Sequence, residues 1–454
     1  MQGATATMNL MDHPYRAMTI GAVALISLLA FEAMAVTTAM PVVATKLDGL
    51  RYFPLAFGGA MAASMVGMVI AGHSADRKGP AVPLWQGIFW FLLGLTVAGA
   101  AEHMLMVVAG RTVMGLGVGM QSVALYACIG KAYPPSLHAR IFGLFAAAWI
   151  IPALVGPLIA GLIIEGWGWR WVFWIAPLLV VPSALMLAPG LRELPAVEAS
   201  TVDQGVQAVE RRRLLLAVGA ALTATVVHQL SQSQTWTAWI LAAIALALMA
   251  RMGARLLPKG VLTMQRGLPS VIALRGLVAA AFATTEIYVP LLLNQQRGYS
   301  PTEAGLVLTA GALSWSLGSW WQGRLPADAA RGPIISTGMS LMAVGILLVS
   351  LIVHPLMPVA VGVVGLILAG IGIGMTFPQL SVLTLRLAPQ QNQGTSVSAL
   401  QLCDALTTTA AVAIGGALFT ALLIYTPDQA YLGNFGLALL MAAIGAWGGR
   451  RVDA

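Results

Sequence analysis

Four ionisable side chains lie within long apolar stretches of the sequence: Glu32, Arg111, Glu286 and Asp404. A charged group inside a lipid-spanning segment is costly, so such residues are functional candidates by default. The chemistry that a carboxylate offers beside a fixed positive charge is the reversible uptake of a proton. We therefore treat these four residues as candidates for proton coupling or for contact with a charged substrate in a cavity.

Glu32 and Arg111 are expected to form a pair. At about 1.5 Å per helical residue, they fall at similar depths in the outer half of a bilayer. Charge attraction would hold the Glu32 carboxylate ionised, whereas burial would favour its protonated form. Glu32 is the leading candidate for the proton carrier, because a carboxylate balanced in this way takes up a proton when its partner moves. The alternative is a permanent ion pair that only fixes helix packing.

Glu286 and Asp404 are the other two acids. Glu286 lies near Pro290, and Asp404 lies near the predicted midplane, which makes it the second choice as proton carrier. Either acid could carry a proton or meet a cationic substrate. In the alternative, each is a protonated carboxyl group bonded to the backbone or to Gln401.

A polar loop with the sequence GHSADRKG runs from Gly72 to Gly79. Its glycines allow a tight turn, and Asp76 can cap a helix N-terminus or pair with Arg77. Such a loop suits a latch that is made in one conformation and broken in another. A weaker echo runs from Gly323 to Gly332. The alternative in each case is a simple charged turn.

The stretch from 143 to 161, GLFAAAWIIPALVGPLIAG, combines Pro152 and Pro157 with Gly156 and Gly161. Proline removes a backbone donor and bends a helix, and small residues at this spacing let a neighbouring helix approach closely. The combination predicts a bent, tightly packed span, as a protein with two halves that rock against each other would need. The alternative is that Gly and Pro are simply common in membrane helices.

Composition identifies the elements that must hold these residues. The 454 residues are 59% hydrophobic and only 9% charged, with a mean hydropathy of +0.85, which excludes a soluble domain. A bilayer core needs roughly 20 apolar residues per span, and a spanning backbone must satisfy its own hydrogen bonds, so we expect an all-α integral membrane protein. The formal net charge is +8, but the basic residues are scattered singly, which favours membrane orientation over nucleic-acid binding.

About fourteen spans are predicted from apolar runs of this length. They fall into an N-terminal six-helix bundle in 1–188, a cytoplasmic linker at 189–213, two additional spans in 214–253 and a C-terminal six-helix bundle in 254–454. Most Lys and Arg residues lie on the inner side if both termini are cytoplasmic. The first apolar run is expected to be a retained helix and not a signal peptide.

An internal repeat supports two related bundles. Glycines at 115, 117 and 119 precede Pro134, and glycines at 370, 372 and 374 precede Pro389 at the same offset. Two homologous halves imply a pseudo-two-fold molecule with its site between them near the midplane. Cys128 and Cys403 fall in apolar runs and are interpreted as reduced core residues. We expect no cofactor and no metal site.

Together these segments resemble the major facilitator superfamily. Gly72–Gly79 resembles its signature loop, Arg111–Gly117 its fourth-helix motif, and Gly143–Gly161 the fifth-helix motif of its proton-coupled exporters. Glu32–Pro41 and Gly168–Phe173 resemble the fourteen-span drug:proton antiporters of the QacA and EmrB type. The chain departs from the pattern at Glu32, Met114, Pro152 and Pro80-Ala81, where Asp, Gln, Gly and basic residues are usual.

The resemblance implies a proton-coupled exporter of amphipathic small molecules in the inner (plasma) membrane, expected to be a monomer. Its partners would be the small-molecule substrate, protons and the lipid bilayer. Two alternatives stay open: a dedicated exporter of one endogenous metabolite or lipid, and a non-transporting membrane sensor or scaffold. No nucleotide-binding loop or catalytic triad is apparent, so we do not expect an enzyme.

Overall fold

The computed structural model describes residues 10–13, 15–49, 52–194, 204–230, 235–299, 301–325 and 330–452. Within these ranges the chain is helical and contains no strand. The helices of the first half are α1 Tyr15–Lys46, α2 Phe53–Lys78, α3 Ala81–Gly99, α4 Met104–Ala132, α5 Pro135–Ala147, α6 Ile150–Trp167 and α7 Arg170–Arg192. They are followed by α8 Gln204–Leu230 and α9 Trp236–Leu256. The second half contains α10 Leu268–Arg297, α11 Pro301–Gln322, α12 Arg331–Leu351, α13 Val359–Leu387, α14 Gln393–Leu423 and α15 Pro427–Gly448.

Proline and glycine set several helix ends. Proline occupies the first turn of α2, α5, α10 and α15, where its missing N–H has no helical partner to lose. α2 ends at Lys78 because Gly79 has a φ of 82°, and α10 ends at Arg297 because Gly298 is left-handed. These positive φ values are the backbone conformations that glycine adopts without strain.

Eleven helices in the described part of the chain are long and apolar enough to cross a membrane, or twelve if one bent pair counts as a single span. That pair covers Pro135–Pro152 and Val155–Trp167 and bends by 42°. The expectation of about fourteen spans is therefore not confirmed; α8 and α11 are not among the eleven. The predicted linker at 189–213 is also too long, because α7 extends to Arg192 and α8 begins at Gln204. Its centre lies outside the described residues.

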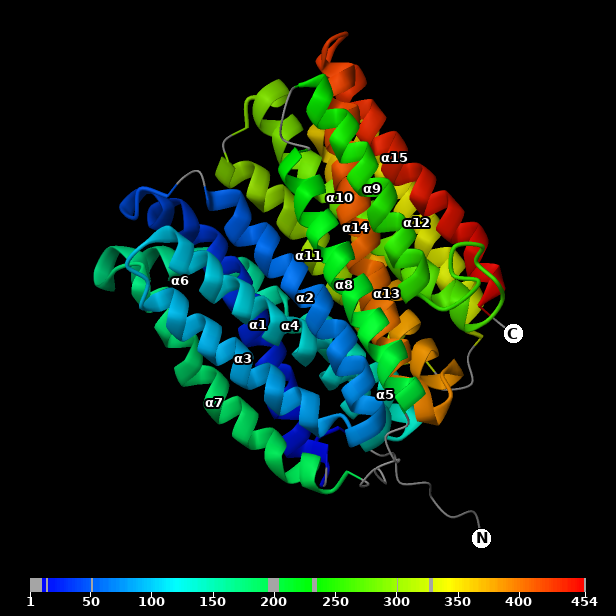
Figure 1. Ribbon diagram of the computed structural model, residues 1–454. Coiled ribbons are helices and arrows are strands. Elements are labelled where there is room, and N and C mark those ends of the chain that lie inside the picture. The colour runs from blue at the N-terminus through cyan, green and yellow to red at the C-terminus, as the bar shows by residue number, and fades with distance from the viewer. Residues whose placement is uncertain are drawn as a thin grey trace.

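Two helical bundles and a central pair make up the molecule (Figure 1). One bundle, blue to blue-green, contains α1–α7, and the other, green to red, contains α10–α15. The green helices α8 and α9 pack on each other and lie along the junction of the bundles, against α2 and α14. Cys128 and Cys403 are buried and free in the two bundles.

The repeated glycines bring three helices of each bundle into backbone contact. A methyl group added at Gly115 or Gly119 of α4 would overlap the backbone of α2 at Ala60 or Ser64. One added at Gly117 would overlap the backbone of α3. α4 thus lies between α2 and α3, and at these glycines no side chain separates its main chain from theirs. Small residues allow this type of contact in membranes.

The second bundle repeats this arrangement with α13 between α11 and α12. Gly370 and Gly374 face the backbone of α11, and Gly372 faces the backbone of α12 at Gly338. The alternating glycines of the sequence repeat thus divide in the same way in both halves. Each bundle therefore contains one triplet of helices in close backbone contact.

Candidate functional site

Glu32 of α1 and Arg111 of α4 lie together inside the first bundle. The Arg111 Nη1 atom is 3.4 Å from the Glu32 Oε1 atom, and both side chains are buried, with 8% and 4% of their surface exposed. Arg111 also donates from Nε to the carbonyl oxygen of Ala56 in α2, at 3.1 Å, and lies over the ring of Phe57. One guanidinium group therefore links three helices, and Glu32 is its acidic partner.

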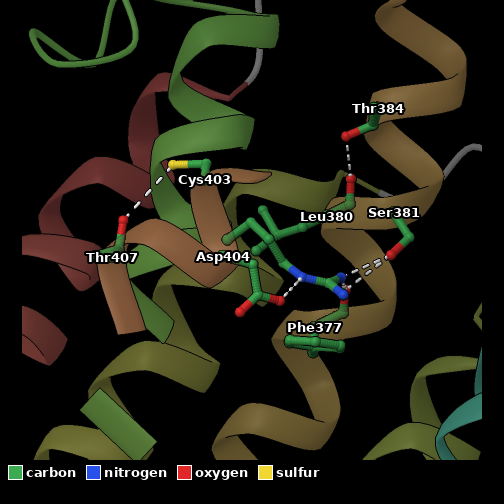
Figure 2. Close-up of polar contacts among 8 residues, drawn as sticks. Phe377, Leu380, Ser381, Thr384, Cys403, Asp404 and Thr407 are labelled. Carbon is green, nitrogen blue, oxygen red and sulfur yellow. Dashed lines mark hydrogen bonds and ion pairs between the residues drawn. The ribbon is translucent and has the colours of Figure 1, made fainter. Parts of the chain in front are cut away.

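Asp404 of α14 has a corresponding partner in the second bundle, Arg275 of α10. The Nε atom of Arg275 donates to the Asp404 Oδ2 atom at 3.1 Å. Its Nη1 atom donates to the carbonyl oxygen of Phe377 at 3.1 Å and to the hydroxyl of Ser381 at 2.9 Å, and the group stacks on the Phe377 ring. Figure 2 shows Asp404 on one helix facing Phe377 and Ser381 on another.

The two arginines share three kinds of contact, and Arg275 adds the hydrogen bond to Ser381. Each binds one carboxylate on one helix and one main-chain carbonyl on another, and each guanidinium lies over a phenylalanine ring. The pairs do not occupy equivalent positions of the repeat, because Arg111 belongs to the fourth helix of its half and Arg275 to the first. They differ in exposure too: 22% of the Asp404 side chain is exposed, against 4% for Glu32.

Arg275 is the residue that sequence reasoning missed. It sits in the apolar run VIALRGLVAA, which is as clear a signal as the run around Arg111. From the sequence alone it counts among the Lys and Arg residues of the inner side and not among the four intramembrane charges. In the structure it is 1% exposed and is among the largest fully buried side chains.

Glu286 does not join either pair. It lies on α10, and its side chain is exposed, as is that of its neighbour Ile287. The four predicted intramembrane charges are therefore not gathered in one cluster. Glu32 and Arg111 meet, Asp404 meets an unpredicted arginine, and Glu286 stands apart.

Asp76 lies at the end of α2 and contacts the other bundle. Its carboxylate accepts hydrogen bonds from the backbone N–H groups of Gly394 and Thr395, at 2.6 and 2.8 Å, and from the Thr395 hydroxyl at 2.6 Å. These groups form the first turn of α14, where free N–H groups and the positive end of the helix dipole favour an anion. Asp76 thus caps a helix that lies more than 300 residues later in the chain.

Gly72 makes this contact sterically feasible. A methyl group added at Gly72 would overlap Ser398 and approach the carbonyl oxygen of Gly394 to 2.8 Å. Gly79, at a φ of 82°, ends α2 one turn later. Arg77 is half-buried beside the contact. The four residues predicted to form a latch therefore surround one contact between the bundles.

A second contact joins the bundles at the same end. Gln322, the last residue of α11, donates to the carbonyl oxygen of Ala139 in α5 at 3.2 Å. Gln322 also accepts a 2.6 Å hydrogen bond from Gln379 of α13, whose own amide oxygen accepts one from Arg331 of α12 at 2.8 Å. This series of buried hydrogen bonds begins at Arg331, within the segment Gly323–Gly332 that resembles the Gly72–Gly79 loop. Asp328 of that segment lies outside the described residues.

The span around Pro152 and Pro157 is bent, as its sequence predicts. Gly156 packs against α1, because an added methyl group would lie 3.1 Å from the Cβ atom of Met34. Gly161 does not fit the expectation of tight packing, since nothing lies within 4 Å of an added methyl group there. Pro152 is buried and Pro157 is exposed.

Comparison with known proteins places this helical architecture in a family. The sequence profile of the Major Facilitator Superfamily matches residues 22–412, and also residues 275–450. The chain belongs to this superfamily. The second match covers only the C-terminal bundle, in agreement with an internal repeat.

Similar members of the superfamily include several drug transporters. The chain is 29% identical to the "Probable multidrug-efflux transporter" of Mycobacterium tuberculosis over 331 residues, which are 70% of either protein. It is 24% identical to the multidrug transporter MdtP of Bacillus subtilis over 403 residues, 86% of this chain and 73% of that one. The multidrug efflux pump SdrM of Staphylococcus aureus is also 24% identical, over 78% of either protein.

Solved structures share the fold. The proton:xylose symporter XylE superposes with a TM-score of 0.65 over 95% of this chain and 94% of that chain. The human organic anion transporter MFSD10 gives 0.68 over 96% and 100%. Both are 14% identical, so the match concerns the fold alone. The superfamily and these relatives indicate a multi-pass membrane transporter of small molecules rather than an enzyme.

Proposed function

We propose that this protein is a proton-coupled secondary exporter of amphipathic small molecules, of the multidrug efflux type, working by alternating access. The names of its relatives support the substrate class. The observation that carries the coupling is the buried pair of Glu32 and Arg111, because a carboxylate enclosed in a membrane span with one opposing charge has an ionisation state that depends on that contact.

Protonation of Glu32 would weaken its contact with Arg111 while leaving the bond from Arg111 to Ala56 in place. α1 would then be released from α4, whereas α4 would stay joined to α2. The proton would enter from the outer side onto the carboxylate and leave to the inner side after the bundles rearrange. Substrate export would occupy the opposite half of the cycle.

The contact of Asp76 with α14 is the proposed latch. In this structure the bundles are joined at the end of the molecule that contains the α2–α3 loop, which the basic-residue pattern assigns to the cytoplasm. In this conformation the proposed transport site between the bundles would be closed to the cytoplasm and open to the outside. Opening toward the cytoplasm would require Asp76 to leave the first turn of α14 and Gln322 to leave Ala139.

The proposed topology follows the fourteen-span drug:proton antiporter branch, with α8 and α9 as the two additional spans and α11 as a further span of the second bundle. α11 packs against α13 as α2 packs against α4, so the repeat supports a spanning role for it. We place both termini in the cytoplasm, the protein in the inner (plasma) membrane, and the functional unit as a monomer.

Purified protein in vesicles with an imposed pH gradient tests the proposal. A panel of amphipathic cations is expected to be transported by the wild type when the gradient is applied. Glu32→Gln is expected to bind substrate but to lose gradient-driven transport, because the amide cannot release a proton. Glu102→Gln, at an exposed position between α3 and α4, is the matched control and should transport normally. Wild-type vesicles with no proton-linked flux of any compound would refute the function.

A further inference from the structure

A cavity of about 530 Å³ lies between α2, α8 and α14. Its walls come from the last turns of α2, the first described turns of α8 and the first turns of α14, with Gln86 of α3 and Leu256 of α9 at the margins. α8 and α9 pack across the junction between the bundles there (Figure 1). None of the residues assigned above to proton coupling lines it.

The polar side of the cavity is strongly basic. Arg77 and Lys78 of α2 face it together with Arg211 and Arg213 of α8. None of the described residues that line it is Asp or Glu, and Ser74, Gln86 and Ser398 add neutral polar groups. Arginine forks and a lysine ammonium group are the side chains that bind phosphate oxygens. The charge therefore fits an anion that carries a phosphate.

The other side of the cavity is apolar. Val69, Ile70, Leu214, Leu256 and Leu402 line it. The outer surface of α8 continues this apolar wall, since Leu215 and Leu222 are 63% and 61% exposed. A soluble phosphate ion would make no use of such a wall. An amphiphile would place its headgroup among the basic residues and its acyl chains along α8.

We propose that this cavity binds the phosphate headgroup of an anionic membrane phospholipid, with its acyl chains lying against α8 and α2. The basic residues stand at helix ends, where juxtamembrane Lys and Arg attract anionic lipids of the adjacent leaflet. The occupant is thus taken from the membrane and not from the aqueous phase.

The site uses both bundles. Arg77 belongs to the first bundle and Ser398 to the second, and Thr395, which also lines the cavity, is one of the two residues that donate to Asp76. The cavity is complete only while α2 and α14 are in contact. A lipid bound there therefore stabilises the conformation in which Asp76 caps α14, because it binds this state better than one with the bundles apart.

Native mass spectrometry of the full-length protein, purified from mixed phosphatidylglycerol and phosphatidylcholine, tests the site without a transport assay. The wild type is expected to retain phosphatidylglycerol selectively. The double variant Arg211→Gln/Arg213→Gln should lower the affinity for phosphatidylglycerol about twenty-fivefold, since each basic residue near an anionic headgroup contributes a factor of about five. Arg212→Gln removes one positive charge from the intervening residue, which does not line the cavity, and is the control for a general loss of charge on α8.

The outcomes separate this site from other sources of anion binding. Equal phosphatidylglycerol retention by the wild type and the double variant, or an equal loss in Arg212→Gln, would overturn the proposal. Displacement of the lipid by millimolar inorganic phosphate would assign the cavity to a soluble anion instead. Leu214→Ser, which keeps the charge, should weaken retention as well, and size-exclusion profiles check that each variant is folded. A protein that retains the lipid but transports nothing would leave this site intact and refute only the exporter function.

Discussion

Each of the two charged pairs contains a buried arginine. The other contacts of that arginine determine how much stability is lost when the carboxylate is removed. Arg275 is 1% exposed, and Asp404 is its acidic partner. The other contacts of Arg275, with Phe377 and Ser381, are neutral or aromatic and do not balance its charge. A buried charge left without its partner is costly, whereas removal of both charges is much less so.

We therefore expect Asp404→Asn to destabilise the protein by about 3 kcal/mol and Arg275→Gln to reverse part of that loss in the double variant. Thermal unfolding of the purified proteins in detergent measures the three free-energy differences. Glu286→Gln, at an exposed position of the same bundle, serves as control and should change stability little. Strictly additive losses in the double variant would mean that the 3.1 Å contact does not couple the two residues.

At this scale the sequence predicted one pair and missed the other. Counting helical rise from the ends of two apolar runs was enough to match the depths of Glu32 and Arg111. It was not enough for Asp404, because Arg275 was counted with the basic residues of the inner side and not within a span. Depth alone also leaves the rotation of a residue about the helix axis undefined. It therefore did not show that the side chain of Glu286, at a plausible depth, would be exposed and outside both pairs.

Among the contacts between helices, those made by the glycines of α4 should be the least tolerant of substitution. Gly119→Ala is expected to cost about 1–3 kcal/mol of stability, because its methyl group would overlap the backbone of α2 at Ser64. Gly161→Ala is the matched control, since nothing lies within 4 Å of its added methyl group. Melting temperatures of the two variants should therefore differ clearly. Equal melting temperatures would show that α2 and α4 relieve this overlap without loss of stability, and would contradict the prediction.

The contact of Asp76 with α14 should bias the position of the bundles. Asp76→Asn removes the charge and weakens the acceptor at the helix N-terminus, at a cost of roughly 1 kcal/mol, equivalent to about a fivefold shift in population. Spin labels at Arg140 of α5 and Arg386 of α13, both exposed, would report the separation by pulsed electron resonance. Thr395→Val removes one of the three bonds and should give a smaller shift. An unchanged distance distribution in Asp76→Asn would rule out the latch.

The elements themselves were predictable to differing degrees. The bend near Pro152 is consistent with the loss of a backbone donor. The glycines of the sequence repeat make corresponding backbone contacts in α4 and α13. The start of α8 did not follow, because the charged stretch Glu210–Arg213 reads as a linker but belongs to the helix. The partners of Asp76 could not be predicted either, because the sequence around Asp76 does not indicate which distant helix its carboxylate contacts.

For the whole molecule, the orientation in the membrane is the main prediction. With both termini in the cytoplasm, Ser200→Cys should react with an impermeant thiol reagent only after the cells are permeabilised. Tyr425→Cys, 73% exposed between α14 and α15, should react in intact cells. Cys128 and Cys403 are buried and provide a low background. Labelling of residue 200 in intact cells would invert the proposed topology.

The glycine triplets and the Asp76 cap differ greatly in the length of chain that they close. α2, α3 and α4 follow one another directly, so their backbone contacts can form as soon as α4 has entered the membrane. The bond from Asp76 to Gly394 spans 318 residues and cannot form until the start of α14 has been synthesised. Since contacts between near segments close at lower entropic cost and domains assemble in order during synthesis, each bundle is expected to mature alone. The joining of the two halves is thus a late step of biogenesis, and it uses the same contact that is proposed to open and close in every later transport cycle.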